Sequence, residues 1–335
     1  YNYNHLNDIT IGYNRKMEQN VNIYSAFLQN EWRTDRWGIL IGGRLDKHSM
    51  VHNVIFSPRA NLRFNPSEHV NLRLTYSSGF RAPQAYDEDM HIAIVGGERV
   101  VTVLAPNLKQ ESSNSLSASA DLYYTFGSVQ TNFLVEAFYT DLRDVFVLRQ
   151  LDHTDGEGNA VLERCNGSGA KVIGINVEAK AGFSSKLQAQ VGITLQRSRY
   201  DKLTLWSDNP DVPGVRRMFR TPDAYGYLTV SYLPIRPLNI SLSATYSGNM
   251  LVQHLEGSGT DIDKAVTTPS FFDANLKVSY DFKIFHYSTL RLSLGMQNIF
   301  NSYQRDFDCG PLRDSGYIYG PTHPRSLFTG ISLTI

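Results

Sequence analysis

Three carboxylates and a histidine gather between residues 78 and 111, in the longest break between two regularly alternating segments. Asp87, Glu88 and Asp89 are adjacent, and His91 follows almost at once. Clustered carboxylate oxygens are ligands that Ca²⁺ takes in proteins, although a hydrated acidic loop has the same composition. An imidazole can ligate a haem iron or another metal centre, or lie unligated in a loop. The stretch is therefore a candidate metal or ligand site. The alternative for each residue is that it belongs to a hydrated loop and binds nothing.

Large aromatic and charged side chains in the polar stretches are candidates for contact with a bulky, flat ligand. Aromatic rings offer stacking surfaces, while guanidinium and imidazole groups offer hydrogen bonds. The candidate ligand-binding residues are Arg81, Tyr86, His91, Arg99, Tyr200, Trp206 and His254. They can share one site only if the stretches that carry them converge.

Motifs for covalent chemistry are absent. The sequence has no His-Glu-x-x-His, no paired Cys-x-x-Cys, no Gly-x-Ser-x-Gly and no Gly-x-x-x-x-Gly-Lys-Ser/Thr. We therefore expect a protein that is not an enzyme and that requires no cofactor. The two cysteines, Cys165 and Cys309, both fall in predicted loops, where they form either one disulfide in an oxidising compartment or two unpaired thiols.

The elements that would position these residues are β-strands, because hydrophobic side chains recur at every second position almost throughout. About fourteen strands are expected by this pattern, one of them predicted to run from Val129 to Gln150. From residue 78 onward, short turns alternate with long polar stretches. The predicted long loops are residues 78–111, 151–169, 200–222, 249–269 and 301–324.

The polar faces of the strands suit a water-filled lumen better than a dry core. Arg73, Gln190 and Lys277 all lie opposite the hydrophobic positions of their strands. The strands run for roughly 10–14 residues, close to the length that crosses a bilayer when tilted, and aromatic residues sit near their ends. No run of about 18 apolar residues exists, which excludes a transmembrane helix. The expected fold class is all-β, a transmembrane antiparallel β-barrel.

Net charge excludes one class of partner. The 32 basic and 32 acidic residues give a formal net charge of zero. A balanced chain has no overall electrostatic attraction for nucleic acid, so we expect no nucleic-acid partner.

Four short motifs give the chain a resemblance to a known family. They are Phe80-Arg81-Ala82-Pro83, Pro106-Asn107-Leu108-Lys109 with Glu111, Asn298-Ile299-Phe300-Asn301 with Tyr303, and Pro324-Arg325 before the last strand. With these motifs the chain resembles the C-terminal barrel portion of a TonB-dependent outer-membrane receptor. The run from Phe80 to Glu98 looks especially like receptors of Bacteroidota.

The resemblance implies a barrel of about 22 strands in the outer membrane of a Gram-negative bacterium. Residues 1–335 would be its C-terminal part, with the first strands and an N-terminal plug domain outside the chain. The family imports scarce, bulky nutrients, so the resemblance implies a ferric siderophore, haem or cobalamin as cargo. The implied partners are outer-membrane lipid, the TonB–ExbB–ExbD complex acting through the plug, and a surface lipoprotein. In haem receptors of the family, two such boxes bracket a haem-binding histidine, the place that His91 occupies here.

Two alternatives remain open from the residues alone. A fourteen-stranded barrel is also a possible passive channel by itself. A surface adhesin or glycan-binding protein could use the barrel only as an anchor. A plug domain encoded upstream would eliminate the passive channel, and uptake that depends on TonB would eliminate the adhesin.

Overall fold

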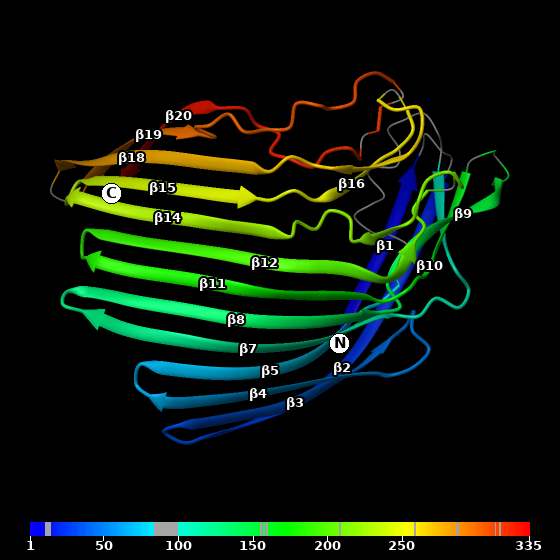
Figure 1. Ribbon diagram of the computed structural model, residues 1–335, viewed down its shortest axis with the longest axis horizontal. Helices are drawn as coiled ribbons and strands as arrows, with labels where there is room; N and C mark the ends of the chain where they lie inside the picture. The colour runs from blue at the N-terminus through cyan, green and yellow to red at the C-terminus, as the bar shows by residue number, and fades with distance from the viewer. Residues whose placement is uncertain are drawn as a thin grey trace.

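One curved antiparallel sheet forms the body of the molecule (Figure 1). The computed structural model describes residues 1–10, 15–83, 100–154, 156, 158, 160–207, 209–257, 259–285, 288–311, 313–314 and 316–335. Within these residues, fourteen strands follow one another through the sheet, each paired with the next. They are β1 (Asn2–Thr10), β2 (Arg15–Arg33), β3 (Trp37–His48), β4 (Ile55–Ser67), β5 (Val70–Arg81), β7 (Glu111–Phe126), β8 (Val129–Arg143), β11 (Ala170–Ser184), β12 (Leu187–Thr204), β14 (Ala224–Ile235), β15 (Leu238–Ser247), β18 (Phe271–Phe285), β19 (Ser288–Gln297) and β20 (Ser326–Thr334).

The predicted all-β fold with about fourteen antiparallel strands is confirmed. In Figure 1 the strands from β3 to β15 form the front wall, and β1 and β2 pass behind it. No helix in the described part of the chain is long and apolar enough to span a membrane.

Short turns join the strands at one end of the sheet, and long connections join them at the other. The short turns are residues 34–36, 68–69, 127–128, 185–186 and 236–237. Gly127 in the third of these has a φ of 62°, a conformation that glycine adopts without steric cost. The long connections after β5 are residues 82–110, 144–169, 205–223, 248–270 and 298–325. The predicted difference between the two ends is confirmed, and it is typical of outer-membrane barrels.

Several long connections carry strands of their own, which corrects the predicted boundaries. The predicted strand from Val129 to Gln150 ends at Arg143, where Asp144 turns the chain with a φ of 54°. The predicted loop 151–169 is largely strand. β9 (Phe146–Thr154) and β10 (Ala160–Asn166) form a small sheet with β6 (Val100–Leu104), while β16 (Leu251–His254) pairs with β17 (Lys264–Thr267) and β13 (Val215–Arg217) pairs with β12.

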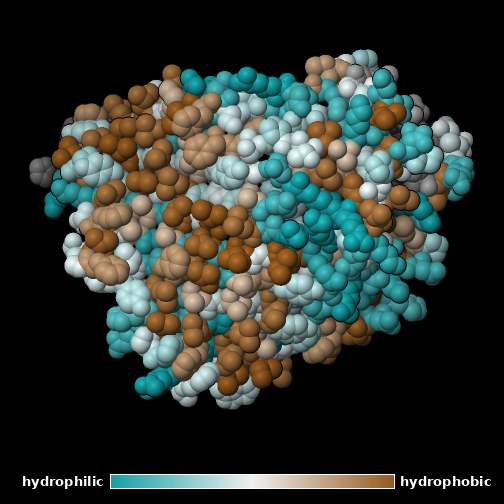
Figure 2. Space-filling view, viewed as in Figure 1, coloured by the Kyte–Doolittle hydropathy of each residue, from teal (hydrophilic) through white to brown (hydrophobic). Residues whose placement is uncertain are grey.

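The two faces of the large sheet differ sharply in polarity. On β12, Ile193 and Leu195 project from one face and are 52% and 58% exposed. Gln190 and Gln196 project from the opposite face with polar neighbours. Large exposed hydrophobic surface is unfavourable in water, so the first face requires apolar surroundings. Figure 2 shows hydrophobic residues over the strands toward the short-turn end and hydrophilic residues toward the long connections.

Candidate functional site

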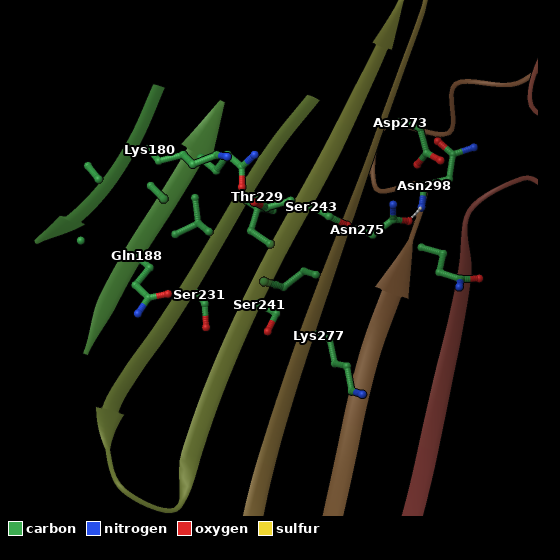
Figure 3. Close-up of a pocket in the computed structure, with 18 of the residues that line it drawn as sticks. Lys180, Gln188, Thr229, Ser231, Ser241, Ser243, Asp273, Asn275, Lys277 and Asn298 are labelled. Carbon is green, nitrogen blue, oxygen red and sulfur yellow. Dashed lines mark hydrogen bonds between the residues drawn. The ribbon is translucent and has the colours of Figure 1, made fainter. Parts of the chain in front are cut away.

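A large cavity runs along the polar face of the sheet (Figure 3). Its volume is about 1260 Å³, and it extends from β7 across to β20. Residues 320–324 of the β19–β20 connection also line it, so the last long connection reaches the inner face. The polar residues labelled in Figure 3 are Lys180, Gln188, Thr229, Ser231, Ser241, Ser243, Asp273, Asn275, Lys277 and Asn298. A cavity of this size and polarity can hold hydrated solute or a polar segment of protein.

Charged groups in the cavity are only partly neutralised by neighbours. Lys180 Nζ lies 3.4 Å from a Glu178 oxygen. Lys277 forms no ion pair within the described residues, and Asp273 Oδ1 is buried without a hydrogen bond there. Because an unpaired buried carboxylate oxygen is costly, this wall is built to meet another polar group.

The first of the family motifs fixes the junction between β5 and its long connection. Ala82 is buried with Val51 from the β3–β4 connection and with Ile55 at the start of β4, and Phe80 packs against them. Arg81, a predicted ligand residue, extends from the end of β5. Its Nε lies 2.9 Å from Glu111 Oε2, and its guanidinium lies 5.0 Å from the centre of the Phe146 ring. Arg81 therefore holds the base of this connection together.

The second motif is held by one asparagine. The backbone N–H of Lys109 donates to Asn166 Oδ1 at 2.8 Å. In return, Asn166 Nδ2 donates to the carbonyl oxygens of Lys109 at 3.1 Å and Asp144 at 2.8 Å. Asn166 thus ties the β5–β7 connection to the β8–β11 connection, so both motifs fasten loop bases.

The third motif begins the β19–β20 connection with two strained asparagines. Asn298 and Asn301 have φ values of 47° and 54°, which asparagine tolerates better than most residues. Buried Asn298 donates through Nδ2 to the carbonyl oxygens of Ser302 at 3.1 Å and His323 at 2.9 Å. The backbone N–H of Arg325 donates to Asn301 Oδ1 at 2.9 Å. These two asparagines close the connection into a loop whose ends are joined.

Three long connections converge at the other end of the sheet from the short turns. We call residues 205–223, 248–270 and 298–325 the loop cluster. Arg220 links the first to the third, because its guanidinium donates to the carbonyl oxygens of Ile318 at 2.8 Å and of Gly316. A β-bridge from Phe219 to Leu251 links the first to the second. The convergence that a shared site requires is therefore present for these three.

His254 lies in the middle of the loop cluster and is buried. Its Nε2 lies 3.0 Å from both carboxylate oxygens of Asp308, and its ring stacks on Tyr317 with centres 3.8 Å apart. Asp308 also accepts from the backbone N–H of Asp314 at 3.1 Å. The predicted ligand residue His254 is thus engaged by protein groups that join two connections.

A carboxylate shared by two phenols lies beside this pair. Tyr317 donates to Asp306 Oδ2 at 3.0 Å, and Tyr319 donates to Asp306 Oδ1 at 2.5 Å. Burial opposes the charge on Asp306, but the hydrogen bonds that it accepts, first those from the two phenols, together outweigh burial and lower the pKa of its carboxyl. Burial and the hydrogen bond to Asp306 raise the pKa of Tyr317 to about 12. The group is therefore a stable anion at neutral pH held by two neutral phenols.

Trp206 is held rigidly within the same cluster. Its Nε1 donates to the carbonyl oxygen of Pro213 at 3.2 Å, and its ring meets Phe219 edge to face with centres 5.3 Å apart. The side chain is half-buried, so part of the indole remains open. Tyr200 lies near the end of β12, opposite Ala170 in the strand register. A fixed, partly open indole is suited to stacking on a flat ligand.

The other predicted ligand and metal residues all fall between positions 86 and 99. Tyr86, Asp87, Glu88, Asp89, His91 and Arg99 lie outside the described residues, so the Ca²⁺ and haem-ligand hypotheses stay predictions. Among the described residues, no group of three or more His, Cys, Asp or Glu side chains is arranged to hold a metal ion.

The disulfide that was one of two alternatives for the cysteines is not formed. Cys165 and Cys309 are both free thiols, which corresponds to the second alternative stated for them. Cys165 lies in β10, opposite Val147, rather than in a loop, whereas Cys309 lies in the β19–β20 connection. The two residues belong to separate connections with different anchors.

Sequence reasoning missed the donors and acceptors that hold the loop cluster together. Asp306, Asp308, Tyr317 and Tyr319 fell within a predicted loop and received no role. The alternation Asp306-x-Asp308 and Tyr317-x-Tyr319 was a weak signal, because facing pairs of donors and acceptors often hold long loops together. Nothing in the sequence indicated that His254 would meet them.

Comparisons with known proteins agree with this architecture. The family model described as "TonB dependent receptor-like, beta-barrel" matches residues 1–299. The heme/hemopexin utilization protein C of Haemophilus influenzae is 24% identical over 263 residues, covering 75% of this chain and 35% of that protein.

Solved structures show the same fold at low identity. A ferric enterobactin receptor of Pseudomonas aeruginosa (PfeA) superposes with a TM-score of 0.66 at 18% identity, over 96% of this chain and 45% of the receptor. The siderophore receptor PirA of Acinetobacter baumannii gives 0.65 at 16% identity, over 94% of this chain and 46% of that one. The chain thus spans less than half the length of each of these relatives. Since the family model covers most of the sequence, the chain belongs to the family of TonB-dependent receptor β-barrels.

Proposed function

We propose that this chain is part of an outer-membrane receptor that imports a bulky iron chelate, a ferric siderophore or haem, with energy delivered through TonB. The observation that carries the proposal is the family match over residues 1–299 on a sheet with one apolar and one polar face. The apolar face suits lipid, and the polar face suits a wet lumen. The receptor itself performs no covalent chemistry.

The choice of iron cargo rests on the relatives. One is named for heme and hemopexin utilization, and others are named as a ferric enterobactin receptor, a siderophore receptor and the FrpB iron transporter of Neisseria meningitidis. Cobalamin, the third cargo that the family resemblance implies, has no relative among these. Iron is therefore the first cargo to test.

The loop cluster is the surface that we assign to cargo capture. It lies at the end of the sheet opposite the short turns, which is the extracellular end in this class of barrel. Trp206 presents a partly open indole there, and Phe307 and Ile318 are exposed on the third connection of the cluster. Apolar and aromatic groups on a braced loop suit a flat or aromatic chelate.

Deletion of the gene in its source bacterium tests the function. Growth in iron-limited medium is supplied in separate arms by haem, by a ferric catecholate siderophore or by ferric citrate. We expect loss of growth, and of radioactive iron uptake, on at least one source, with the same loss when TonB is deleted. Uptake that continues without TonB would indicate a passive channel. Loss of cobalamin uptake alone would refute iron as the cargo.

Two single tryptophan substitutions, compared with each other, test where the cargo binds. Trp206→Ala in the full-length receptor removes the indole from the loop cluster, and we expect about tenfold weaker cargo binding because one aromatic contact is lost. Trp32→Ala is the matched control, since Trp32 is exposed beside the short turn at the opposite end of the sheet. Equal binding by both variants would remove Trp206 from the cargo site while leaving the transport assignment intact.

A further inference from the structure

A small sheet in the β5–β7 and β8–β11 connections has an edge with no strand beside it. The order of its strands is β6–β10–β9, so β10 is paired on both sides and β9 on one. Within the described residues, the second edge of β9 pairs with no other strand. Figure 1 places β9 at the outer margin of the molecule, on the side of the long connections. An unpaired edge presents a row of main-chain donors and acceptors, so it is a template for another strand.

The strand register fixes which main-chain groups of β9 point to this open edge. The N–H of Gly167 donates to the carbonyl oxygen of Val145 at 2.7 Å, and the same register continues with Val147 opposite Cys165. In an antiparallel pair, only alternate residues exchange hydrogen bonds with the neighbouring strand. The odd-numbered residues of β9 therefore bond toward β10. The residues that turn their N–H and C=O groups outward are Phe146, Leu148 and Gln150.

The chain itself occupies the first of these outward positions and leaves the next two. The N–H of Phe146 donates to Glu111 Oε1, from the first residue of β7. That bond agrees with the register, because it requires the Phe146 N–H to point away from β10. No backbone hydrogen bond joins Leu148 or Gln150 to a described residue outside their own sheet. Two consecutive outward positions are therefore open, which is enough to pair with a strand of about four residues.

The base of the small sheet is held firmly, so the open edge has a fixed position. Asn166, at the end of β10, is hydrogen-bonded to backbone groups of Lys109 and Asp144. Val161 and Arg164 on the same strand are only 5% and 3% exposed. A strand that binds to an edge already in place avoids the entropic cost of ordering that edge.

The chemistry of the open edge selects an extended polypeptide as its partner. Donors and acceptors alternate along the edge at the spacing of a β-strand, and the main chain of an extended segment matches them. A ferric chelate or a sugar has no such repeating row of groups. Exposed edges are commonly blocked by proline or by very short strands, but β9 has nine residues and no proline. The edge is therefore suited to the addition of a strand.

A second copy of this chain fits the edge poorly. Registers on the regular part of β9, residues 146–150, meet one of two obstacles. Any register that involves Phe146 needs the N–H that Glu111 already holds. The register that pairs Leu148 with a second copy's Gln150 avoids this, but it places Arg149 opposite Arg149 of that copy. Like charges at directly opposite positions destabilise a pair of strands. A segment of a different protein meets neither obstacle.

We propose that the outer edge of β9 binds an extended segment of another extracellular protein by strand addition, through main-chain hydrogen bonds to Leu148 and Gln150. The extracellular position of β9 rests on the proposed function, whereas its open edge depends on neither the cargo nor TonB. Strand addition and import can therefore fail independently.

Peptide selection on the full-length receptor in detergent micelles tests the proposal. Random nonapeptides displayed on phage are selected on the unaltered receptor, after removal of those that bind Leu148→Pro. Proline lacks the outward N–H and is tolerated at an edge position that does not bond to the next strand, so β10 should stay paired. We expect peptides to be enriched and, as synthetic probes, to bind Leu148→Pro about tenfold more weakly. Leu148→Val keeps the N–H and should bind them as the unaltered receptor does.

Methylation of the peptide tests the same contact without altering the receptor. Alternate N–H groups of an added strand bond to β9, so N-methylation at those positions should weaken binding about tenfold, and at the intervening positions should leave it nearly unchanged. Equal hydrogen exchange of β10 in Leu148→Pro and the unaltered receptor would show that the variant folds. The proposal would be overturned if no peptide were enriched, or if methylation acted equally at both sets of positions. A receptor dimer in sedimentation that Leu148→Pro dissolves would also overturn it, because the edge would then bind a second copy.

Discussion

The sheet and the loop cluster hold their residues by different means. Along the sheet, backbone pairs continue from β1 to β20, and side chains alternate between an apolar and a polar face. In the loop cluster, side-chain hydrogen bonds take the place of backbone pairing between strands. Arg220, Asn298 and Gln304 donate to backbone carbonyl oxygens of distant residues. The comparison indicates that the sheet tolerates exchange of many side chains, whereas the cluster depends on a few polar ones, of which Asn298 and Gln304 are buried.

Removal of a buried acceptor should have the largest effect, and it should be confined to the loop cluster. Asp308→Ala deletes the carboxylate between His254 and the backbone N–H of Asp314, leaving buried His254 and the part-buried N–H without this partner. We expect local opening to become easier by about 3 kcal/mol, the cost of leaving two hydrogen-bonding groups without their shared acceptor. Hydrogen exchange should accelerate in residues 251–267 and 303–320, with β8 and β11 unchanged.

Asp308→Asn is the matched control for this substitution. The amide keeps one acceptor and nearly the same volume, so exchange should rise less than in Asp308→Ala. Equal acceleration in the strands of both variants would show that the cluster and the sheet are one cooperative unit.

The complementary substitution acts on the sheet alone. A Cβ added at Gly295 on β19 would collide with the ring of Phe328 on β20, which lies over the glycine. Gly295→Val should therefore lower stability by about 2 kcal/mol through overpacking. Heat unfolding followed by gel mobility should report it, while hydrogen exchange in the loop cluster stays unchanged.

Relief of the same collision checks its cause. In the double variant G295V/F328A the ring is absent, so part of the lost stability should return. Strictly additive losses for the two substitutions would mean that the ring and the added side chain do not meet.

The contrast between the two regions also explains what the sequence could predict. Period-two alternation in β11, β12 and β15 reflects one apolar and one polar face, a condition repeated at every strand, so strand number and turn asymmetry followed from it. Long-range pairing in the loop cluster has no such period. His254 meets Asp308 across 54 positions, and nothing local to either residue specifies the other.

The family motifs were only partly predictable from the sequence. Phe80-Arg81-Ala82-Pro83 and Asn298-Ile299-Phe300-Asn301 were recognised as signatures, but their structural reasons appear only in the fold. Ala82 is small because it is buried against Val51, and Asn298 adopts a positive φ while binding two carbonyl groups. A motif therefore identified where strands meet loops without showing what it contacts.

A smaller effect is expected where the two regions join. Arg81→Ala removes the ion pair to Glu111 and the contact with Phe146, which are partly exposed. We expect about 1 kcal/mol of lost local stability, the size of a surface ion pair with a cation–π contact. Faster hydrogen exchange in residues 105–111 and 144–149 would report this loss. Arg81→Lys keeps the positive charge, so it should lose less stability than Arg81→Ala. No change in these segments would mean that Asn166 alone fixes the junction.

Extreme pH should destabilise the loop cluster but not the sheet, and neither region should change near neutral pH. The lowered pKa of Asp306 contributes stability that is present above its unfolded value and is lost as the pH falls through the lower folded value. The raised pKa of Tyr317 acts in the opposite range: its contribution is complete below pH 10.0 and is lost as the pH rises toward about 12. The loop cluster should therefore open at both acid and alkaline pH. His254 and Asp308 are the titratable groups beside Asp306 and Tyr317. The sheet, which is stabilised by backbone pairs, should stay intact.

Fluorescence of a single indole measures this opening. The chain has three tryptophans, and replacing Trp32 and Trp37 with Phe leaves Trp206 inside the loop cluster as the reporter. Tyr317→Phe keeps the ring on His254 but removes the hydroxyl, so the alkaline transition should weaken, whereas Asp306→Asn should weaken the acid one. If both variants keep the pH profile of the parent, ionisation of this group does not hold the cluster, and the backbone contacts of Arg220 and Gln304 suffice to order it.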